Sequence, residues 1–245
     1  MSVDSNAART SYAVDPDGVA LLRLERPEAR NAMDTQMLEE LLAHLASARE
    51  DDAVRVLVLS SSDQMGLSAG ADVREKLDDD GQLRRMQLFA DLYDAIVAFP
   101  RPTVAACHGD VVGGGAEVAV ACDMRVGGAN LRMRFPAAAL GVPVGPARLV
   151  TLCGLAAAKY LLFSSRTVGP DEALRIGLVN RVAPAAKTEE AALELAAAVA
   201  AHPPEAVARL KRMLHGWDDV EGRSKAEGVG QVEWAREGPG LPQPD

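Results

Sequence analysis

The sequence is poor in cysteine and in basic side chains. Its three cysteines, Cys107, Cys122 and Cys153, are an odd number without a Cys-x-x-Cys pair, which argues against a disulfide framework or a zinc knuckle. Lys and Arg number 26 against 35 Asp and Glu, so the net charge is −9, and such a surface is unsuited to nucleic acid or an anionic membrane. We therefore expect reduced, buried cysteines, no bound metal, and no nucleic-acid or membrane partner. A small anionic ligand held by a few local donors stays open.

The sequence also lacks the apolar segments that direct a chain to a membrane. Its first ten residues are polar and contain no apolar core of a signal peptide. The apolar helical stretch at residues 191–201 carries Glu194 and is too short to span a bilayer. With 245 residues, of which 48% are hydrophobic, the chain is long enough to bury a large core without covalent staples. We expect a soluble protein of the cytoplasm.

Strands and helices are predicted to alternate through the first half. Strands are predicted at residues 19–25, 54–59 and 103–107. Helices are predicted after an Asp34 cap, at about 81–99 and at 113–121. Such alternation favours an α/β layered fold. The last third reads as helices at residues 147–152, 155–163, 170–175, 187–201, 203–214 and 218–236. The segment beyond about residue 190 has the pattern of amphipathic helices with no strand to cover, so these helices either pack against another subunit or form a helical cap.

Two short patterns suggest enzymes that the rest of the sequence disfavours. Gly66-x-Ser68-x-Gly70 matches the nucleophile elbow of α/β-hydrolases, but polar residues 60–65 separate it from the preceding strand, so a turn of small residues is favoured over a Ser68 hydrolase. The glycines at 109–115 are similar to the nucleotide turn of short-chain dehydrogenases. That turn belongs after the first strand, and no tyrosine here has a lysine four residues later, which argues against hydride transfer.

A third pattern combines two segments, the loop at residues 68–72 and the helix start at residues 113–117. Glycine lets a backbone approach a ligand closely, and a helix N-terminus offers unpaired N–H donors. If the two segments faced each other, they would form an oxyanion hole beside the Glu117 carboxylate, an arrangement suited to an enolate. Tight helix–strand packing explains the same glycines equally well, with Glu117 an ordinary first-turn residue.

Several longer blocks, taken together, resemble a known family. They are Arg26-Pro-Glu-Ala-Arg-Asn31-Ala-Met33, Ser68-Ala-Gly-Ala-Asp72-Val-Arg-Glu75, Ala105-Ala-Cys-His-Gly109, Gly113-Gly-Gly-Ala-Glu117-Val-Ala119, Cys122-Asp-Met-Arg125 and Asp171-Glu-Ala-Leu-Arg-Ile-Gly-Leu-Val-Asn180-Arg-Val182. In this order, over about residues 19–185, they resemble the enoyl-CoA hydratase/isomerase (crotonase) superfamily. Several matched blocks in series are more specific than any single motif.

The resemblance implies a fold and an assembly. The expected fold is a crotonase-like spiral of ββα repeats over residues 11–190, which holds the CoA site. Residues 191–245 are then a C-terminal helical region of the kind that makes trimers, often as dimers of trimers. We therefore expect a homotrimer or homohexamer.

The resemblance also implies the site. The family binds an acyl-CoA thioester whose carbonyl oxygen lies between two backbone amides, and those positions match Ala71 and Gly114. The catalytic carboxylate matches Glu117. Coenzyme A is part of the substrate, so no separate cofactor is expected. The segments that match substrate-contacting positions supply Ala29, Arg30, Ala32, Ala69, Gly70, Asp72, Val73, Gly113, Pro136 and Ala137.

Two departures from the family pattern bear on the reaction. Hydratases carry a second glutamate in Phe-Gly-x-Pro-Glu, where this chain has Ala137, and the glycine-rich turn that follows is shortened to residues 141–146. Loss of a positioned acid–base group typically costs about 10²–10⁴ in rate, which disfavours ordinary hydration. Double-bond isomerisation, thioester decarboxylation and a relaxed hydration each need only the amide pair and one base. A non-catalytic acyl-CoA-binding protein is the alternative.

Other side chains near these blocks have two interpretations each. Arg30 and Arg74 are candidate contacts for CoA phosphates or plain surface residues. His108 is predicted to be structural rather than a proton donor. An acyl pocket or simple helix core would be formed by Leu83, Met86, Phe89 and Tyr93.

Overall fold

The computed structural model describes residues 7–238, which contain two β-sheets. The larger has the order β1 (Thr10–Val14), β2 (Val19–Leu24), β3 (Val56–Ser61), β5 (Thr103–Cys107), β7 (Met124–Gly128) and β10 (Arg181–Ala183). The smaller has the order β4 (Gly66–Ser68), β6 (Asp110–Val112), β8 (Arg132–Arg134) and β9 (Thr167–Val168). Neighbouring strands are parallel except for β1 with β2 and β8 with β9.

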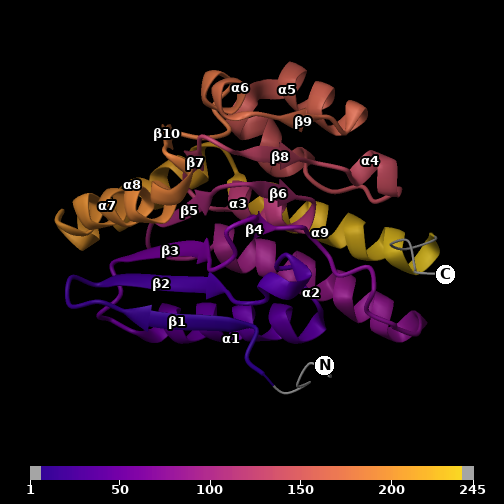
Figure 1. The fold of residues 1–245 in the computed structure, drawn as a ribbon, viewed down its shortest axis with the longest axis horizontal. Coiled ribbons are helices and arrows are strands. Elements are labelled where there is room, and N and C mark those ends of the chain that lie inside the picture. Colours follow the sequence, from indigo (N-terminus) through magenta and orange to yellow (C-terminus); the bar gives the residue numbers. More distant parts are fainter. Residues whose placement is uncertain (1–6, 239–245) are drawn as a thin grey trace.

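The two sheets are built from a repeated unit of two strands and a helix. In β3–β4–α2, β5–β6–α3 and β7–β8–α4, the first strand joins the larger sheet and the second joins the smaller one. The helices of these units are α2 (Asp79–Val97), α3 (Gly114–Ala121) and α4 (Ala137–Leu140). Figure 1 shows the units rising one above another along the chain. The predicted spiral of ββα repeats is confirmed.

Local sequence explains most of the element boundaries. The strands β3 and β5 are buried along their whole length, as expected for parallel strands covered on both faces. Helix α1 (Thr35–Glu50) begins at Asp34, whose carboxylate accepts a hydrogen bond of 2.9 Å from the Met37 amide, so the predicted cap is present. Short 3-10 turns lie at Pro27–Ala29 and Ala185–Lys187.

The helices of the last third are close to those predicted. They are α5 (Pro146–Ser164), α6 (Pro170–Arg175), α7 (Thr188–Ala200), α8 (Pro204–Trp217) and α9 (Val220–Glu237). The two helices predicted at residues 147–152 and 155–163 are the halves of α5, divided by Gly154 with φ 77° and ψ 161°. Length and composition alone would let α5 cross a membrane. The break at Gly154 leaves each half far short of the ~20 residues that a straight span needs.

The C-terminal helices differ in what they cover. Helix α7 packs on β3, β5 and β7 through Ala192 and Ala196, whose small side chains let the helix approach the sheet closely. The expectation that the segment beyond residue 190 has no strand to cover is therefore wrong. Helix α9 packs against α2 and α5 of the same chain, and Figure 1 shows it in yellow beside α2. Helix α8 buries Lys211 and exposes the apolar side chains of Leu210, Met213, Leu214 and Trp217. Residues 239–245 of the predicted helical region lie outside the described residues.

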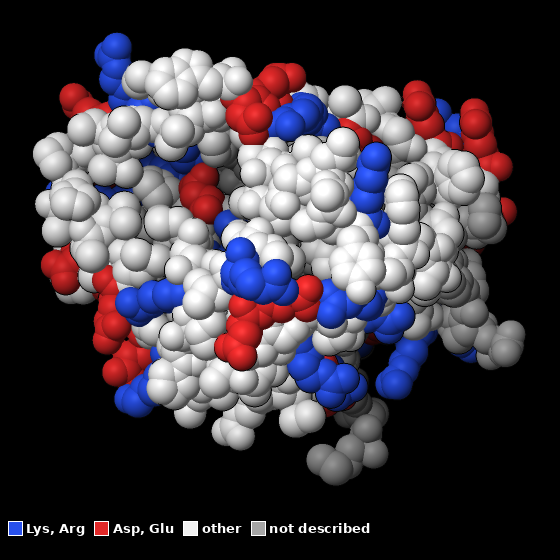
Figure 2. Space-filling view, turned by 90° about the horizontal axis from the view of Figure 1, so that it is seen from above, with Lys and Arg blue, Asp and Glu red and all other residues white. Residues whose placement is uncertain are grey.

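The cysteines and the charged surface agree with composition, apart from one detail. All three cysteines are free, and burial raises the pKa of Cys107 and Cys122 to about 12. Cys153 is only half-buried, which corrects the prediction for that residue, because it lies beside the break in α5. Seen from above α5 and α6, Lys and Arg alternate with Asp and Glu around uncharged areas (Figure 2), so this face has no continuous basic surface.

Candidate active site

The loop after β4 and the start of α3 meet in the structure. Gly70 has φ +96°, and a Cβ atom there would lie 2.8 Å from the Val112 carbonyl oxygen and 3.3 Å from the Gly114 nitrogen. Only glycine permits both this backbone conformation and this approach. Gly113, with φ +52°, turns the chain from β6 into α3. The two segments that the sequence pattern paired are therefore adjacent.

Hydrogen bonds fix the loop after β4, and two backbone amides beside it, those of Ala71 and Gly114, donate no hydrogen bond within residues 7–238. The Met33 amide donates to the Gly70 carbonyl at 2.7 Å, and the Asp72 amide donates to the Met33 carbonyl at 2.9 Å. The Ala71 amide between them donates no hydrogen bond within residues 7–238, and neither does the Gly114 amide, which is the first of α3 and has no acceptor inside the helix. Both residues line one cavity.

Ser68 has a structural role in the same loop. Its side chain is 1% exposed. Its hydroxyl donates to the Asn31 carbonyl at 2.6 Å and accepts from the Gly70 amide at 3.1 Å. It lies within β4 and is followed by a loop rather than a helix, so no nucleophile elbow forms. The Ser68 hydrolase hypothesis has no geometric support.

The cavity has a volume of about 280 Å³ and a mainly apolar lining. The predicted site residues that line it are Ala69, Gly70, Ala71, Val73, Gly113, Gly114, Glu117, Pro136 and Ala137. Met86, Phe89 and Tyr93 of α2 line it as predicted. Leu83 does not, because it lies one helical turn before Met86, beyond the cavity.

A groove of about 510 Å³ adjoins the cavity and shares Ala69, Ala71 and Val73 with it. The remaining predicted contact residues line this groove: Ala29, Arg30, Ala32 and Asp72, together with Arg74. Asp72 has a structural role, because its carboxylate forms an ion pair with Arg26 at 2.6 Å. The Arg30 guanidinium is largely exposed and lies 3.3 Å from the Asp110 carboxylate.

His108, whose Nε2 lies 2.7 Å from the Asp63 carbonyl oxygen, lines a different pocket, as expected of a structural histidine.

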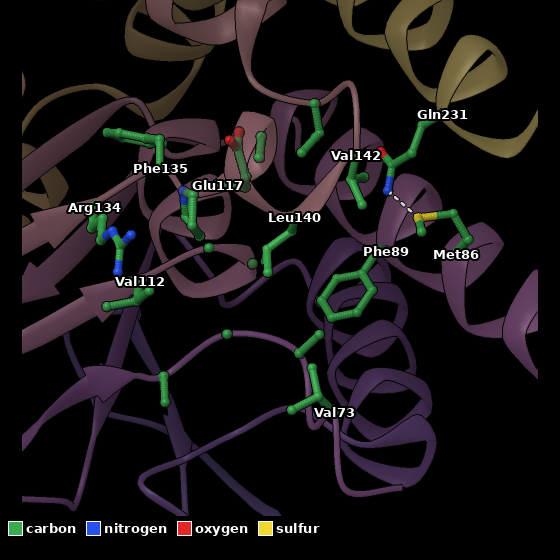
Figure 3. A pocket seen from close by; sticks show the side chains of 18 of the residues that line it. Val73, Met86, Phe89, Val112, Glu117, Arg134, Phe135, Leu140, Val142 and Gln231 are labelled. Atoms are coloured by element: carbon green, nitrogen blue, oxygen red, sulfur yellow. Dashed lines mark hydrogen bonds between the residues drawn. The ribbon is translucent and has the colours of Figure 1, made fainter. Parts of the chain in front are cut away.

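Glu117 is the only carboxylate among the described residues that line the cavity. Its side chain lies in the first turn of α3 and is 1% exposed. Oε2 accepts hydrogen bonds from Nε and Nη2 of Arg148, at 3.1 and 3.0 Å, whereas Oε1 has no partner within residues 7–238. Figure 3 shows the carboxylate on one wall of the cavity, across from Met86 and Gln231. One oxygen is thus anchored and the other is free.

A buried arginine joins the carboxylate to the C-terminal helix. Arg148 of α5 pairs with both Glu117 and Glu227 of α9, and its guanidinium carbon lies 4.7 Å from the centre of the Tyr93 ring. The amides of Gly145 and Ala147 also donate to the Glu227 carboxylate, at 3.1 and 2.7 Å. Two carboxylates therefore share one buried guanidinium.

This environment raises the pKa of Glu117 to about 7. Burial is the largest cause, Arg148 lowers the pKa, and Glu227 raises it. A carboxyl group with a pKa near neutrality can both accept and release a proton at physiological pH. The arrangement suits a proton shuttle beside two free amide donors.

The raised pKa predicts how stability depends on pH. Between about pH 4.5 and 7 folded Glu117 holds a proton that the unfolded chain has released, so the free energy of unfolding falls as the pH rises through this range. Glu117→Gln lacks this dependence. The stability of the wild type relative to this variant should fall by on the order of 3 kcal/mol from about pH 5 to about pH 8, measured by urea unfolding. Parallel stability profiles for the two proteins would show that burial does not raise this pKa.

Among the site residues that were not predicted from sequence, three are polar and enter the argument below: Arg148, Glu227 and Gln231. Arg148 left a signal, since it is the only charged residue between Gly141 and Gly154, and a lone charge in an apolar helix needs a partner. Glu227 and Gln231 lie in a helix rich in polar residues, where nothing distinguishes them from their neighbours.

Known proteins resemble this chain in both sequence and structure. The family model for enoyl-CoA hydratase/isomerase matches residues 15–228. A short-chain-enoyl-CoA hydratase from Clostridium acetobutylicum is 31% identical over 202 residues, which cover 80% of this chain and 77% of that protein. A 2,3-dehydroadipyl-CoA hydratase from Escherichia coli is 33% identical over 205 residues, which cover 82% of this chain and 79% of that protein.

Solved structures agree with the sequence matches. The crystal structure of a probable enoyl-CoA hydratase from Mycobacterium smegmatis has a TM-score of 0.83 at 28% identity, and the match covers 94% of this chain and 95% of that one. The shared fold, the order of the sequence blocks and the match over most of the chain point to one family. The chain belongs to the enoyl-CoA hydratase/isomerase family, within the crotonase superfamily.

Proposed function

We propose that this protein is an acyl-CoA enzyme that moves the double bond of an enoyl-CoA through a thioester enolate. The amides of Ala71 and Gly114 hold the thioester oxygen, and Glu117 is the single acid–base group. One observation carries the proposal: two amides without acceptors and one carboxylate with a free oxygen line the same apolar cavity. Preorganised donors of this kind stabilise developing negative charge on oxygen.

The cavity binds the acyl part of the substrate and the adjoining groove binds its CoA part. The acyl chain occupies the cavity beside Phe89 and Tyr93, and the CoA moiety lies along the adjoining groove past Ala29, Arg30 and Ala32. The thioester then lies where the cavity and the groove meet, at Ala71. Arg30 and Arg74 are the candidate contacts for CoA phosphates in the groove, where Arg30 is largely exposed although it pairs with Asp110. The groove residues Arg26 and Asp72 are paired with each other.

The reaction needs one carboxylate. Glu117 removes a proton from C2 of a 3-enoyl thioester, and the electron pair moves onto the thioester oxygen, which the Ala71 and Gly114 amides stabilise. As the enolate collapses, a double bond forms between C2 and C3, the bond between C3 and C4 becomes single, and Glu117 returns its proton to C4. The proton is conserved, so no other acid is consumed.

Hydration needs a second group that the cavity lacks. One carboxylate must activate water while another delivers a proton to carbon. The position matching the second glutamate of hydratases is Ala137, at the start of α4, and its methyl group cannot exchange a proton. Isomerisation is therefore the reaction that these residues favour.

A panel of CoA esters tests the proposal. We expect purified protein to convert a 3-enoyl-CoA into the conjugated 2-enoyl-CoA, followed by the ultraviolet absorbance of the conjugated thioester, faster than it hydrates the 2-enoyl-CoA. A malonyl-type CoA ester in the same panel tests decarboxylation. Dominant hydration or decarboxylation would replace isomerisation as the activity. Tight binding of all three esters without turnover would identify a non-catalytic acyl-CoA-binding protein.

We also propose that the chain assembles as a homotrimer or homohexamer. Helix α8 supports this, because its apolar residues Leu210, Leu214 and Trp217 are exposed in the single chain, and a contiguous exposed apolar patch usually marks an interaction site. Sedimentation equilibrium would contradict the proposal by giving the mass of one chain.

A further inference from the structure

Gln231 is a polar side chain buried at the edge of the apolar cavity. It lies on α9 and is 3% exposed, and it lines the cavity together with Met86 and Val142. Its Nε2 donates to the Met86 sulfur at 2.8 Å, and its Oε1 is buried without a hydrogen-bond partner among the described residues. A thioether is a weak acceptor, so neither end of this amide is well satisfied.

Burying such a group has an energetic cost. A buried carbonyl without a hydrogen-bond partner destabilises the folded protein. The apolar cluster at this end of the cavity consists of Met86 and Val142 with Ala71, Val144 and Ala235 packed against them. Turning the amide over exchanges the two atoms but still leaves one of them facing sulfur or hydrocarbon. The chain therefore holds a buried polar group whose partner is not among residues 7–238.

Position within the cavity indicates what the partner is. Glu117 lies on one wall and Gln231 on the opposite side, with Val142 between them in Figure 3. In the proposed function the reacting carbons lie beside Glu117, so the amide of Gln231 faces acyl atoms on the side of the cavity away from that carboxylate. Arg134, the only cation that lines the cavity among the described residues, lies far from Gln231 in the same view.

We propose that Gln231 determines acyl specificity by binding a neutral hydroxyl or amide group on the acyl chain, on the side of the cavity away from Glu117. A group with an O–H or N–H satisfies the Oε1 acceptor. A carboxylate would lack a counter-charge at this end, and an ammonium group would lose its hydration among apolar side chains without gaining a carboxylate. The inference rests on the proposed function and adds the class of substrate.

Two matched substrates and two matched variants test the inference. The substrates are a 3-enoyl-CoA and its ω-hydroxy counterpart of equal chain length, compared over a series of lengths. In Gln231→Met, which replaces the amide by an apolar chain of similar size, kcat/KM for the best hydroxylated ester should fall roughly 10- to 100-fold. The value for the unsubstituted ester should stay unchanged or rise. Glu233→Met, an exposed change on the same helix, should leave both values unchanged.

The outcomes separate this inference from the proposed function. If the wild type prefers the unsubstituted ester at every length, or if Gln231→Met lowers kcat/KM equally for both esters, Gln231 does not recognise a polar group on the acyl chain. If the wild type turns over neither ester, the proposed function fails. Calorimetric Kd values for saturated acyl-CoA and ω-hydroxyacyl-CoA then decide the inference, and equal affinities in the wild type overturn it.

Discussion

Glu117→Gln is expected to lower kcat by roughly 10²–10⁴-fold, the usual effect of losing a positioned acid–base group. Glutamine keeps the shape of the side chain, and its amide oxygen still accepts from Arg148. It cannot take a proton from carbon. Stopped-flow or steady-state turnover of the best 3-enoyl-CoA measures kcat, and calorimetric binding of a saturated acyl-CoA measures whether the cavity stays intact.

The control for this variant removes a carboxylate elsewhere. Glu172 pairs with Arg166 on the surface and lines no part of the cavity, so Glu172→Gln should leave kcat unchanged. Unaltered turnover in Glu117→Gln, with binding also unaltered, would show that another group moves the proton.

Arg148→Met should destabilise the fold by about 3–5 kcal/mol at about pH 8, because removing one partner of a buried ion pair leaves uncompensated charge. Arg148 is 4% exposed and holds both Glu117 and Glu227. The loss should be smaller at about pH 5, where the Glu117 carboxyl is protonated. Urea unfolding at the two pH values measures the difference. Removing Arg148 also removes the interaction that lowers the pKa of Glu117, so the acidic limb of the kcat profile should move to higher pH.

An exposed arginine in a similar setting is the matched control. Arg166 pairs with Glu172 and lies over the ring of Tyr160, at 5.1 Å, but it is close to solvent. Arg166→Met should change stability far less, because exposed ion pairs contribute little. An equal loss from Arg148→Met at both pH values would mean that packing, rather than charge, accounts for the role of Arg148.

Local patterns in the sequence predicted most of the helices, the strands β2, β3 and β5, and the family, but not the remaining strands, which are short or lie at sheet edges; β9 and β10 interrupt the last third, where only helices were predicted. The Asp34 cap, the buried strand Thr103–Cys107 and helix α6 at Pro170–Arg175 lie where nearest neighbours along the chain predict them. Caps, strand periodicity and first-turn prolines act over a few residues, so a single sequence reports them. The sequence blocks also predicted the spiral of repeats, and Ala71, Gly114 and Glu117 were identified as candidates because short motifs contain them.

The charge pairing in the site and the lining of its cavity depended on tertiary structure. Arg148 meets Glu227 across 79 positions, and Gln231 meets Met86 across 145. These contacts exist because α9 folds back onto α2 and α5 of its own chain. The sequence by itself determined which acid the family motif offers. Only packing decided that this acid is buried and shares one guanidinium with a second carboxylate. Packing also decided that the Gln231 amide lines the cavity. Burial and charge pairing depend on neighbours in space, which the order of residues along the chain does not give.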